Sequence, residues 1–126
     1  MFAYSDHVWD LLNGARTIDQ VVKLGVPELH PRQTTDTARA FGEVEKLLKR
    51  EVPKIQDGPA PIVCHMTDGE FTGADPEPVV RRIKEMAVAD GNVLIENIFI
   101  SDQLLAEPIA DIRAWPGVTA QTPDEP

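Results

Sequence analysis

The sequence lacks the residues for an internal disulfide and the long apolar segments that insert into a membrane. Its 126 residues include one cysteine, Cys64, so no disulfide can form within the chain. No apolar run approaches the roughly 18 residues that a membrane helix needs. The first residues also lack the basic and apolar regions of a secretory signal. We therefore expect a cytoplasmic protein.

Basic residues are also scarce, with 12 Lys and Arg against 21 Asp and Glu and a net charge of −9. This charge opposes binding to phosphate backbones and anionic lipids, so we expect neither nucleic acid nor membrane as a partner. No Gly-x-x-x-x-Gly-Lys loop, Gly-x-Gly-x-x-Gly turn or Gly-x-Ser-x-Gly elbow is present. The commonest signals of nucleotide-binding proteins and serine hydrolases are therefore missing.

Three apolar segments predict β-strands. The clearest extends from Asn92 to Ile100, and a second extends from Ala60 to Thr67, between turn-forming residues. The clearest one has few polar interruptions, which is typical of a strand covered on both faces. Phe2 to Tyr4 predicts the end of a third strand.

Two amphipathic segments between these strands predict helices. One extends from Thr37 to about Val52, and the other from Pro76 to about Ala89, with Asp75 placed to cap its first turn. The predicted buried positions are Ala38, Phe41, Val44, Leu47 and Leu48 in the first helix and Val79, Val80, Ile83, Met86 and Ala87 in the second. The alternation of strands and helices predicts an α/β fold with parallel crossovers.

Each predicted strand is followed by a hydroxyl residue and an aspartate. The three pairs are Ser5-Asp6, Thr67-Asp68 and Ser101-Asp102. The carboxyl ends of parallel strands share one edge of a sheet, where such folds bind ligands, and oxygen ligands suit Mg²⁺ or Mn²⁺. A simpler alternative is that each aspartate only turns the chain or caps the next element. The glycine-containing loop after its strand favours Asp68 as a site residue.

Thr35 directly precedes the first predicted helix. Its hydroxyl can therefore face the same sheet edge as Asp68. Threonine is also a common helix N-cap, and this alternative stays open.

Together these segments resemble a von Willebrand factor A domain of the bacterial intracellular kind. The resemblance lies in Thr35-Asp36-Thr37, in residues 62–70 and in residues 90–94, and it extends over about residues 2–109. It implies a doubly wound, mostly parallel sheet flanked by helices, in a non-enzymatic protein-interaction module. It also implies a metal-ion-dependent adhesion site in which Thr35 and Asp68 hold Mg²⁺ or Mn²⁺ and a protein partner supplies a carboxylate. Asp6, Glu70 and Asp102 are accessory acidic candidates.

The resemblance is incomplete because the family's site also needs an Asp-x-Ser-x-Ser loop. The chain has two serines, Ser5 and Ser101, and neither lies two residues after an aspartate. Phe2 to Asp6 resembles the family's second strand, which implies a partial domain over residues 1–115, lacking its central strand, and a loop or flexible tail over 116–126. We therefore expect weak or absent metal binding and association through an uncovered sheet edge. The alternative is a structural remnant that binds no metal.

Cys64 and His65 are neighbours on a predicted strand. Their side chains should point to opposite faces, so they cannot act together as nucleophile and base. We predict that Cys64 is a small core residue. A weaker functional alternative is a metal-dependent hydrolase that uses His65, Asp68 and Glu70, although no His-Glu-x-x-His spacing supports it.

Overall fold

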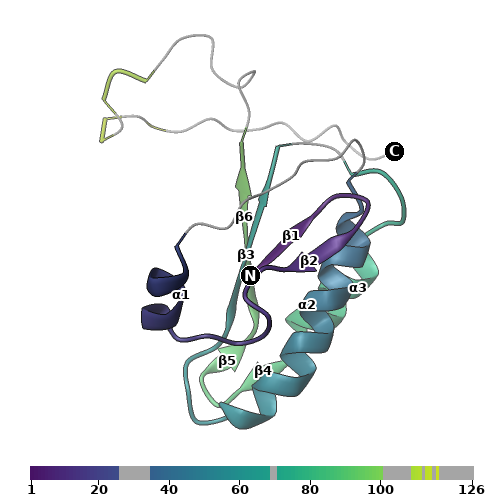
Figure 1. Ribbon diagram of the computed structural model, residues 1–126, viewed down its shortest axis with the longest axis vertical. Coiled ribbons are helices and arrows are strands. Elements are labelled where there is room, and N and C mark those ends of the chain that lie inside the picture. Colours follow the sequence, from purple (N-terminus) through teal and green to yellow (C-terminus); the bar gives the residue numbers. More distant parts are fainter. Residues whose placement is uncertain (26–34, 69–70, 101–108, 112, 115, 117–126) are drawn as a thin grey trace.

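Two apolar strands pair in parallel near the middle of the structure (Figure 1). The structure is a computed structural model that describes residues 1–25, 35–68, 71–100, 109–111, 113–114 and 116. β3 (Ile62–Thr67) pairs with β6 (Leu94–Phe99) along its whole length, from Ile62 beside Leu94 to Thr67 beside Phe99. The prediction of two strands joined in parallel at these segments is confirmed.

α2 (Thr37–Glu51) confirms the first predicted helix. Its N-cap is Asp36, whose carboxylate accepts a hydrogen bond from the backbone N–H of Arg39 at 2.9 Å. The helix continues into one turn of 3₁₀ helix, η1 (Val52–Lys54). Pro53 has no N–H to donate to the preceding turn, which explains why the α-helix ends here.

α3 (Glu77–Lys84) is shorter than the helix predicted from Pro76 to Ala89. At its start, the Asp75 carboxylate accepts the N–H of Glu77 at 2.8 Å, but the N-cap residue is Pro76 and not Asp75 as predicted. Past Lys84 the chain forms an antiparallel hairpin of β4 (Ala87–Val88) and β5 (Gly91–Asn92). The Asn92 side chain donates to the carbonyl of Lys84 at 2.8 Å and so satisfies one of the carbonyls at the end of the helix.

The core lies between the two helices and one face of the β3–β6 ladder, which we call the inner face. Its buried apolar residues are Phe41, Leu48, Val52, Val79, Ile83, Val88 and Val93, and Val63 and Ile95 pack against them from the strands. The buried stripe of α2 is rotated from the predicted one, because Ala40 and Glu45 are buried whereas Ala38 and Leu47 are partly exposed. Ala87, predicted to be buried, is exposed in the hairpin.

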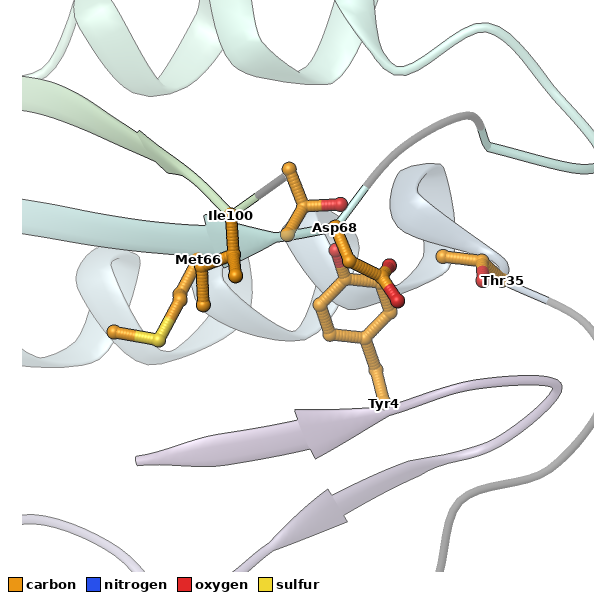
Figure 2. Close-up of a pocket in the computed structure, with 6 residues that line it drawn as sticks. Tyr4, Thr35, Met66, Asp68 and Ile100 are labelled. Carbon is orange, nitrogen blue, oxygen red and sulfur yellow. The ribbon is translucent and has the colours of Figure 1, made fainter. Parts of the chain in front are cut away.

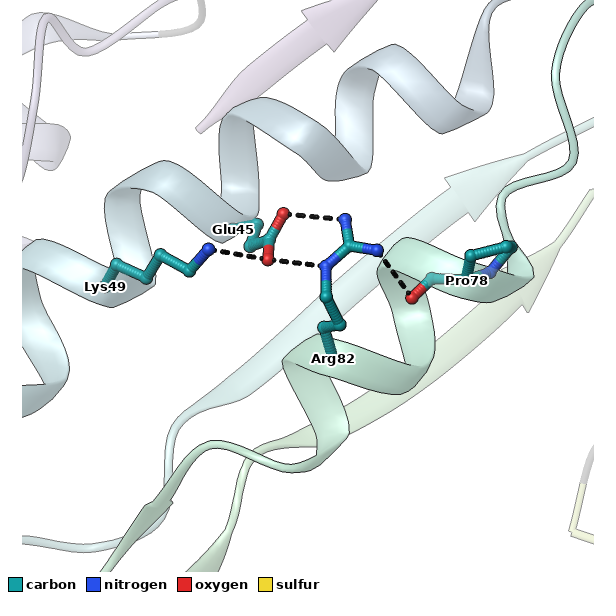
Figure 3. Close-up of polar contacts among 4 residues, drawn as sticks. All are labelled: Glu45, Lys49, Pro78 and Arg82. Carbon is teal, nitrogen blue, oxygen red and sulfur yellow. Dashed lines mark hydrogen bonds and ion pairs between the residues drawn. The ribbon is translucent and has the colours of Figure 1, made fainter.

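An ion pair crosses the interface between α2 and α3 (Figure 3). The Arg82 guanidinium donates to both carboxylate oxygens of Glu45, at 2.9 and 3.0 Å, and Lys49 lies 2.8 Å from the same carboxylate. The hydrogen bonds from Arg82 first and Lys49 second lower the pKa of Glu45 from 4.5 to about 2. These partners explain how a carboxylate is accommodated in the buried stripe of α2.

The opening residues form a hairpin in which β1 (Phe2–Tyr4) pairs antiparallel with β2 (Val8–Asp10). The sequence predicts the first of these strands but not the second. Both strands pack against α2. The described strands form three separate two-stranded sheets, β1–β2, β3–β6 and β4–β5. The fold is therefore a mixture of helices and strands with a small parallel sheet.

The second face of the β3–β6 ladder, which we call the outer face, is exposed. Its side chains are Ile62, Cys64, Met66, Leu94, Glu96 and Ile98, and Ile100 continues it past the end of β6. Met66, for example, is 58% exposed. The prediction that both faces are covered is thus wrong for the described residues, and so is the prediction that Cys64 belongs to the core.

A further helix, α1 (Ile18–Leu24), lies in a segment for which we predict no element from the sequence. It begins with a capping box in which the Thr17 hydroxyl accepts the N–H of Gln20 and the Gln20 side chain accepts the N–H of Thr17. None of its residues is buried. Of the helices in the described segments, none combines the length and the apolar content that crossing a bilayer requires.

We predict that Glu45→Gln lowers the free energy of unfolding at neutral pH. The substitution should also reduce how steeply this free energy falls as the pH is lowered. The folded-state pKa of Glu45 is depressed, so its contribution is fully present above pH 4.5 and is lost as the pH falls towards 2. Denaturant unfolding at a series of pH values measures this slope.

Glu43→Gln is the matched control, because Glu43 pairs with Lys46 on the exposed side of the same helix. Exposed pairs contribute only about 0 to 1 kcal/mol. An acid dependence that is the same in Glu45→Gln as in the unmodified chain would contradict the assignment.

Candidate functional site

An open pocket of about 290 Å³ lies at the carboxyl end of β3 (Figure 2). Its lining residues come from the first hairpin, the start of α2 and the ends of β3 and β6. They are Tyr4, Thr35, Met66, Thr67, Asp68 and Ile100. Thr35 and Asp68, which the sequence predicts as metal ligands, therefore line the same pocket.

Hydrogen bonds of its backbone hold Thr35 in place, and it is not the N-cap of α2. Asp36 caps α2, so the alternative that Thr35 is the N-cap is wrong. The N–H of Thr35 donates to the hydroxyl oxygen of Thr72 at 3.0 Å, and its carbonyl accepts the N–H of Thr72 at 2.8 Å. These bonds tie the start of α2 to the loop after β3 and leave the Thr35 hydroxyl beside the pocket.

Asp68 lies directly after β3, and its side chain is exposed. Figure 2 shows its carboxylate on the side of the pocket that faces Thr35. Within the described segments this carboxylate has no hydrogen-bond or ion-pair partner. It is therefore available to a ligand that enters from solvent.

The other acidic candidates do not add to the pocket. Asp6 lies in the turn between β1 and β2, with its carboxylate 2.9 Å from the Ser5 hydroxyl and 3.3 Å from the His7 ring. The Ser5 carbonyl accepts the N–H of Asp36 at 2.8 Å, which places this turn beside the start of α2. Glu70 and Asp102 lie outside the described residues. In the part of the chain that is described, no three His, Cys, Asp or Glu side chains form a metal-binding group.

A chain of hydrogen bonds that the sequence does not predict orients Tyr4. Its hydroxyl lies 2.6 Å from Nε2 of His65, and Nδ1 of His65 lies 3.0 Å from Oδ1 of Asn97. An amide oxygen only accepts, so Nδ1 carries the proton and Nε2 accepts the tyrosine proton. The ring of Phe41 packs 5.0 Å from the His65 ring. The lone pairs of the Tyr4 oxygen consequently remain available beside the pocket.

The sequence signal for these hydrogen bonds is Asn97, a polar residue in an apolar strand. In the parallel register Asn97 lies beside His65, and Glu96 lies beside Cys64. Side chains alternate along a strand, so Asn97 belongs to the inner face and Glu96 to the outer face. These bonds can be predicted only if the pairing register of β3 and β6 is known, and the sequence alone does not give this register.

The hydrolase alternative receives no support from this geometry. His65 directs its ring nitrogens to Tyr4 and Asn97 and does not line the pocket that contains Asp68. Its third residue, Glu70, lies outside the described part of the chain. A general base has to be within hydrogen-bond reach of the reacting group, and His65 is already engaged with protein partners.

One wall of the pocket is polar and consists of oxygen-bearing side chains. One carboxylate and three hydroxyls, from Asp68, Thr35, Thr67 and Tyr4, lie on its walls. Oxygen atoms of these types are the ligands that Mg²⁺ and Mn²⁺ prefer. Met66 and Ile100 form an apolar wall beside them.

Comparisons with known proteins do not indicate a function for the chain. No family model matches the chain, and neither a curated protein nor a solved structure matches it. The pocket and the contacts that position its walls are therefore the basis for assigning a function.

We predict that Tyr4 and His65 are energetically coupled. In a double-mutant cycle, Tyr4→Phe and His65→Ala should show a coupling of about 0.5 to 1.5 kcal/mol in the free energy of unfolding, the usual contribution of one hydrogen bond. Cys64→Ala is the control for His65→Ala, because Cys64 is the strand neighbour on the opposite face. Its effect should add to that of Tyr4→Phe within about 0.5 kcal/mol. Additivity of the Tyr4 and His65 substitutions would refute the hydrogen bond.

Proposed function

We propose that the chain is a non-enzymatic protein-interaction module of the von Willebrand factor A type with a partial metal-ion-dependent adhesion site. Thr35 and Asp68 hold Mg²⁺ or Mn²⁺ weakly, and an acidic side chain of a protein partner completes the coordination. The observation that carries the proposal is that these two residues, from separate loops, line one pocket at the carboxyl end of a parallel strand.

The surrounding architecture supports this proposal. Parallel strands such as β3 and β6 need a crossover, and α3 lies between them in the chain. Ligands of open α/β sheets bind beyond the carboxyl ends of such strands, which is where Asp68 lies. In the proposed interpretation, β1–β2 and β3–β6 are two parts of one doubly wound sheet whose central strand is missing. α2 packs against the hairpin, and Phe41 of α2 packs on His65 of β3, so this helix touches both parts.

The charge balance of the pocket favours an acidic partner. A divalent cation held by the single carboxylate of Asp68 retains positive charge, which a second carboxylate would neutralise. The chain as a whole is strongly acidic and repels such a partner at long range, so the ion would supply the attraction. Mg²⁺ gives up its water reluctantly, and two protein ligands therefore hold it only weakly.

We predict weak or undetectable heat on calorimetric titration of the full chain with Mg²⁺ or Mn²⁺. The site is then located by NMR, where paramagnetic Mn²⁺ should broaden the backbone signals of Thr35 and Asp68. Asp68→Asn, which removes the charge and keeps the shape, should abolish this broadening.

Asp57→Asn is the control, because Asp57 is an exposed aspartate remote from the pocket lining, and broadening should persist in it. Broadening that is unchanged in Asp68→Asn would refute the site. Tight binding that depends on Asp68 would instead mean that a further residue, such as Asp6 or Glu70, completes the coordination.

A second candidate function is a structural remnant that binds no metal and is stabilised by packing against a complementary chain. The observation that favours it is the separation of the described strands into three two-stranded sheets. β1 and β3 each have one paired edge, so their other edges present backbone groups without a strand partner among the described residues. Such edges are templates for association.

We predict that the purified chain is only marginally stable and associates in solution. A domain has a net stability of about 5 to 15 kcal/mol, and each large apolar side chain left uncovered forgoes about 1.5 to 3 kcal/mol. Size-exclusion chromatography combined with denaturant unfolding measures both properties. A monodisperse monomer with one cooperative transition of several kcal/mol would refute the missing-strand interpretation, on which the remnant depends.

A further inference from the structure

α1 is a short helix with an exposed apolar side. It has 7 residues, and none of them is buried. Ile18 is 81% exposed and Val22 is 74% exposed, and both lie on one side of the helix at a spacing of four residues. Isolated helices shorter than about 12 residues are marginal in water, and their stability in proteins comes from packing an apolar side. The helix therefore needs an apolar surface.

The described part of the chain offers one such surface, the outer face of β3–β6. Its apolar side chains, Ile62, Met66, Leu94, Ile98 and Ile100, are all exposed. Glu96 lies beside Cys64 at the middle of this face, and the apolar side chains lie on both sides of it. An exposed apolar patch usually marks a binding surface. Figure 1 shows α1 on the opposite side of this ladder from α2 and α3.

We infer that α1 closes onto the outer face of its own chain, with Ile18 and Val22 packed against the apolar side chains of β3 and β6. The ladder then carries helices on both faces, the arrangement by which a parallel sheet is removed from water. This closure requires no metal at Asp68, although Met66 and Ile100 belong both to the outer face and to the pocket wall.

The covalent connection of α1 to the rest of the chain favours this helix over a second copy. A short tether, residues 11–17, joins α1 to β2, and tethers of this kind give effective concentrations on the order of millimolar. A helix of 7 residues is about 10 Å long, whereas a strand of 6 residues is about 20 Å long, so α1 covers about half of the ladder.

Cys64 provides a direct probe of this closure. It is the only cysteine in the sequence and lies near the middle of the outer face. The rate at which its thiol reacts with an aromatic disulfide reagent measures how often the face is open. If the closed form is about ten times as populated as the open form, labelling of the folded chain is about tenfold slower than labelling of an open face.

The experiment compares the unmodified chain with Val22→Asp, Ile18→Asp, Val22→Leu and Ala15→Asp, with a chelator present so that metal plays no part. Val22→Asp and Ile18→Asp should each accelerate labelling about tenfold, because a buried carboxylate opposes closure. Val22→Leu keeps the apolar contact and should label at the unmodified rate. Ala15→Asp adds the same charge at an exposed position outside the helix and should also leave the rate unchanged. Equal denaturation midpoints confirm that the compared variants are folded.

Three results would overturn the inference. Fast labelling of the unmodified chain, equal to that of Val22→Asp, would show that the face is open. Slow labelling that becomes fast on dilution, together with a dimer on size exclusion, would show that a second copy covers it. Slow labelling of a monomer that neither aspartate variant accelerates would show that another segment covers it.

Discussion

The burial of the inner face of β3–β6 by α2 and α3 is the constraint on which the rest of the structure depends. Ile83 of α3 and Val93, which precedes β6, are fully buried at this junction. Because the two strands are parallel, their carboxyl ends reach the same edge. α2 covers the ladder with its first residue at that edge, which the bonds between Thr35 and Thr72 show. The pocket is thus a consequence of how the core packs.

The ion pair between Glu45 and Arg82 lies in the interface between α2 and α3 and is part of this packing. Burying a carboxylate costs free energy unless strong hydrogen-bond donors satisfy it. The Arg82 guanidinium donates two parallel hydrogen bonds to Glu45, and their geometry depends on how the two helices are oriented. The pair therefore restricts how α3 lies along α2, while the apolar contacts around it supply the burial. The lowered pKa of Glu45 reports the same bonds.

The sequence predicts those elements whose signal is local and fails where two local signals compete. α2, β3 and β6 are predicted from long periodic or apolar runs. The end of α3 is not, because Ala87 continues the helical spacing from Ile83, and Gly91 is equally typical of a helix end and of a hairpin turn. In the folded chain the hairpin forms, and the bond from the Asn92 side chain to the Lys84 carbonyl joins it to the end of the helix. In the same way, an apolar run does not tell which face of a strand is covered, so the exposure of Cys64 depends on packing.

The two walls of the pocket are held by different sets of bonds. Thr35 and the loop after β3 are joined by three hydrogen bonds between the Thr35 backbone and Thr72. Tyr4 is joined to β3 through a side-chain bond to His65, with no backbone ladder between β1 and β3 in the described residues. The hairpin is also bound to α2, where the Ser5 carbonyl accepts the N–H of Asp36 and the Asp6 carbonyl accepts the Arg39 guanidinium. A ligand that bridges the pocket would therefore add a direct connection between Tyr4 and the end of β3 to the indirect one through α2.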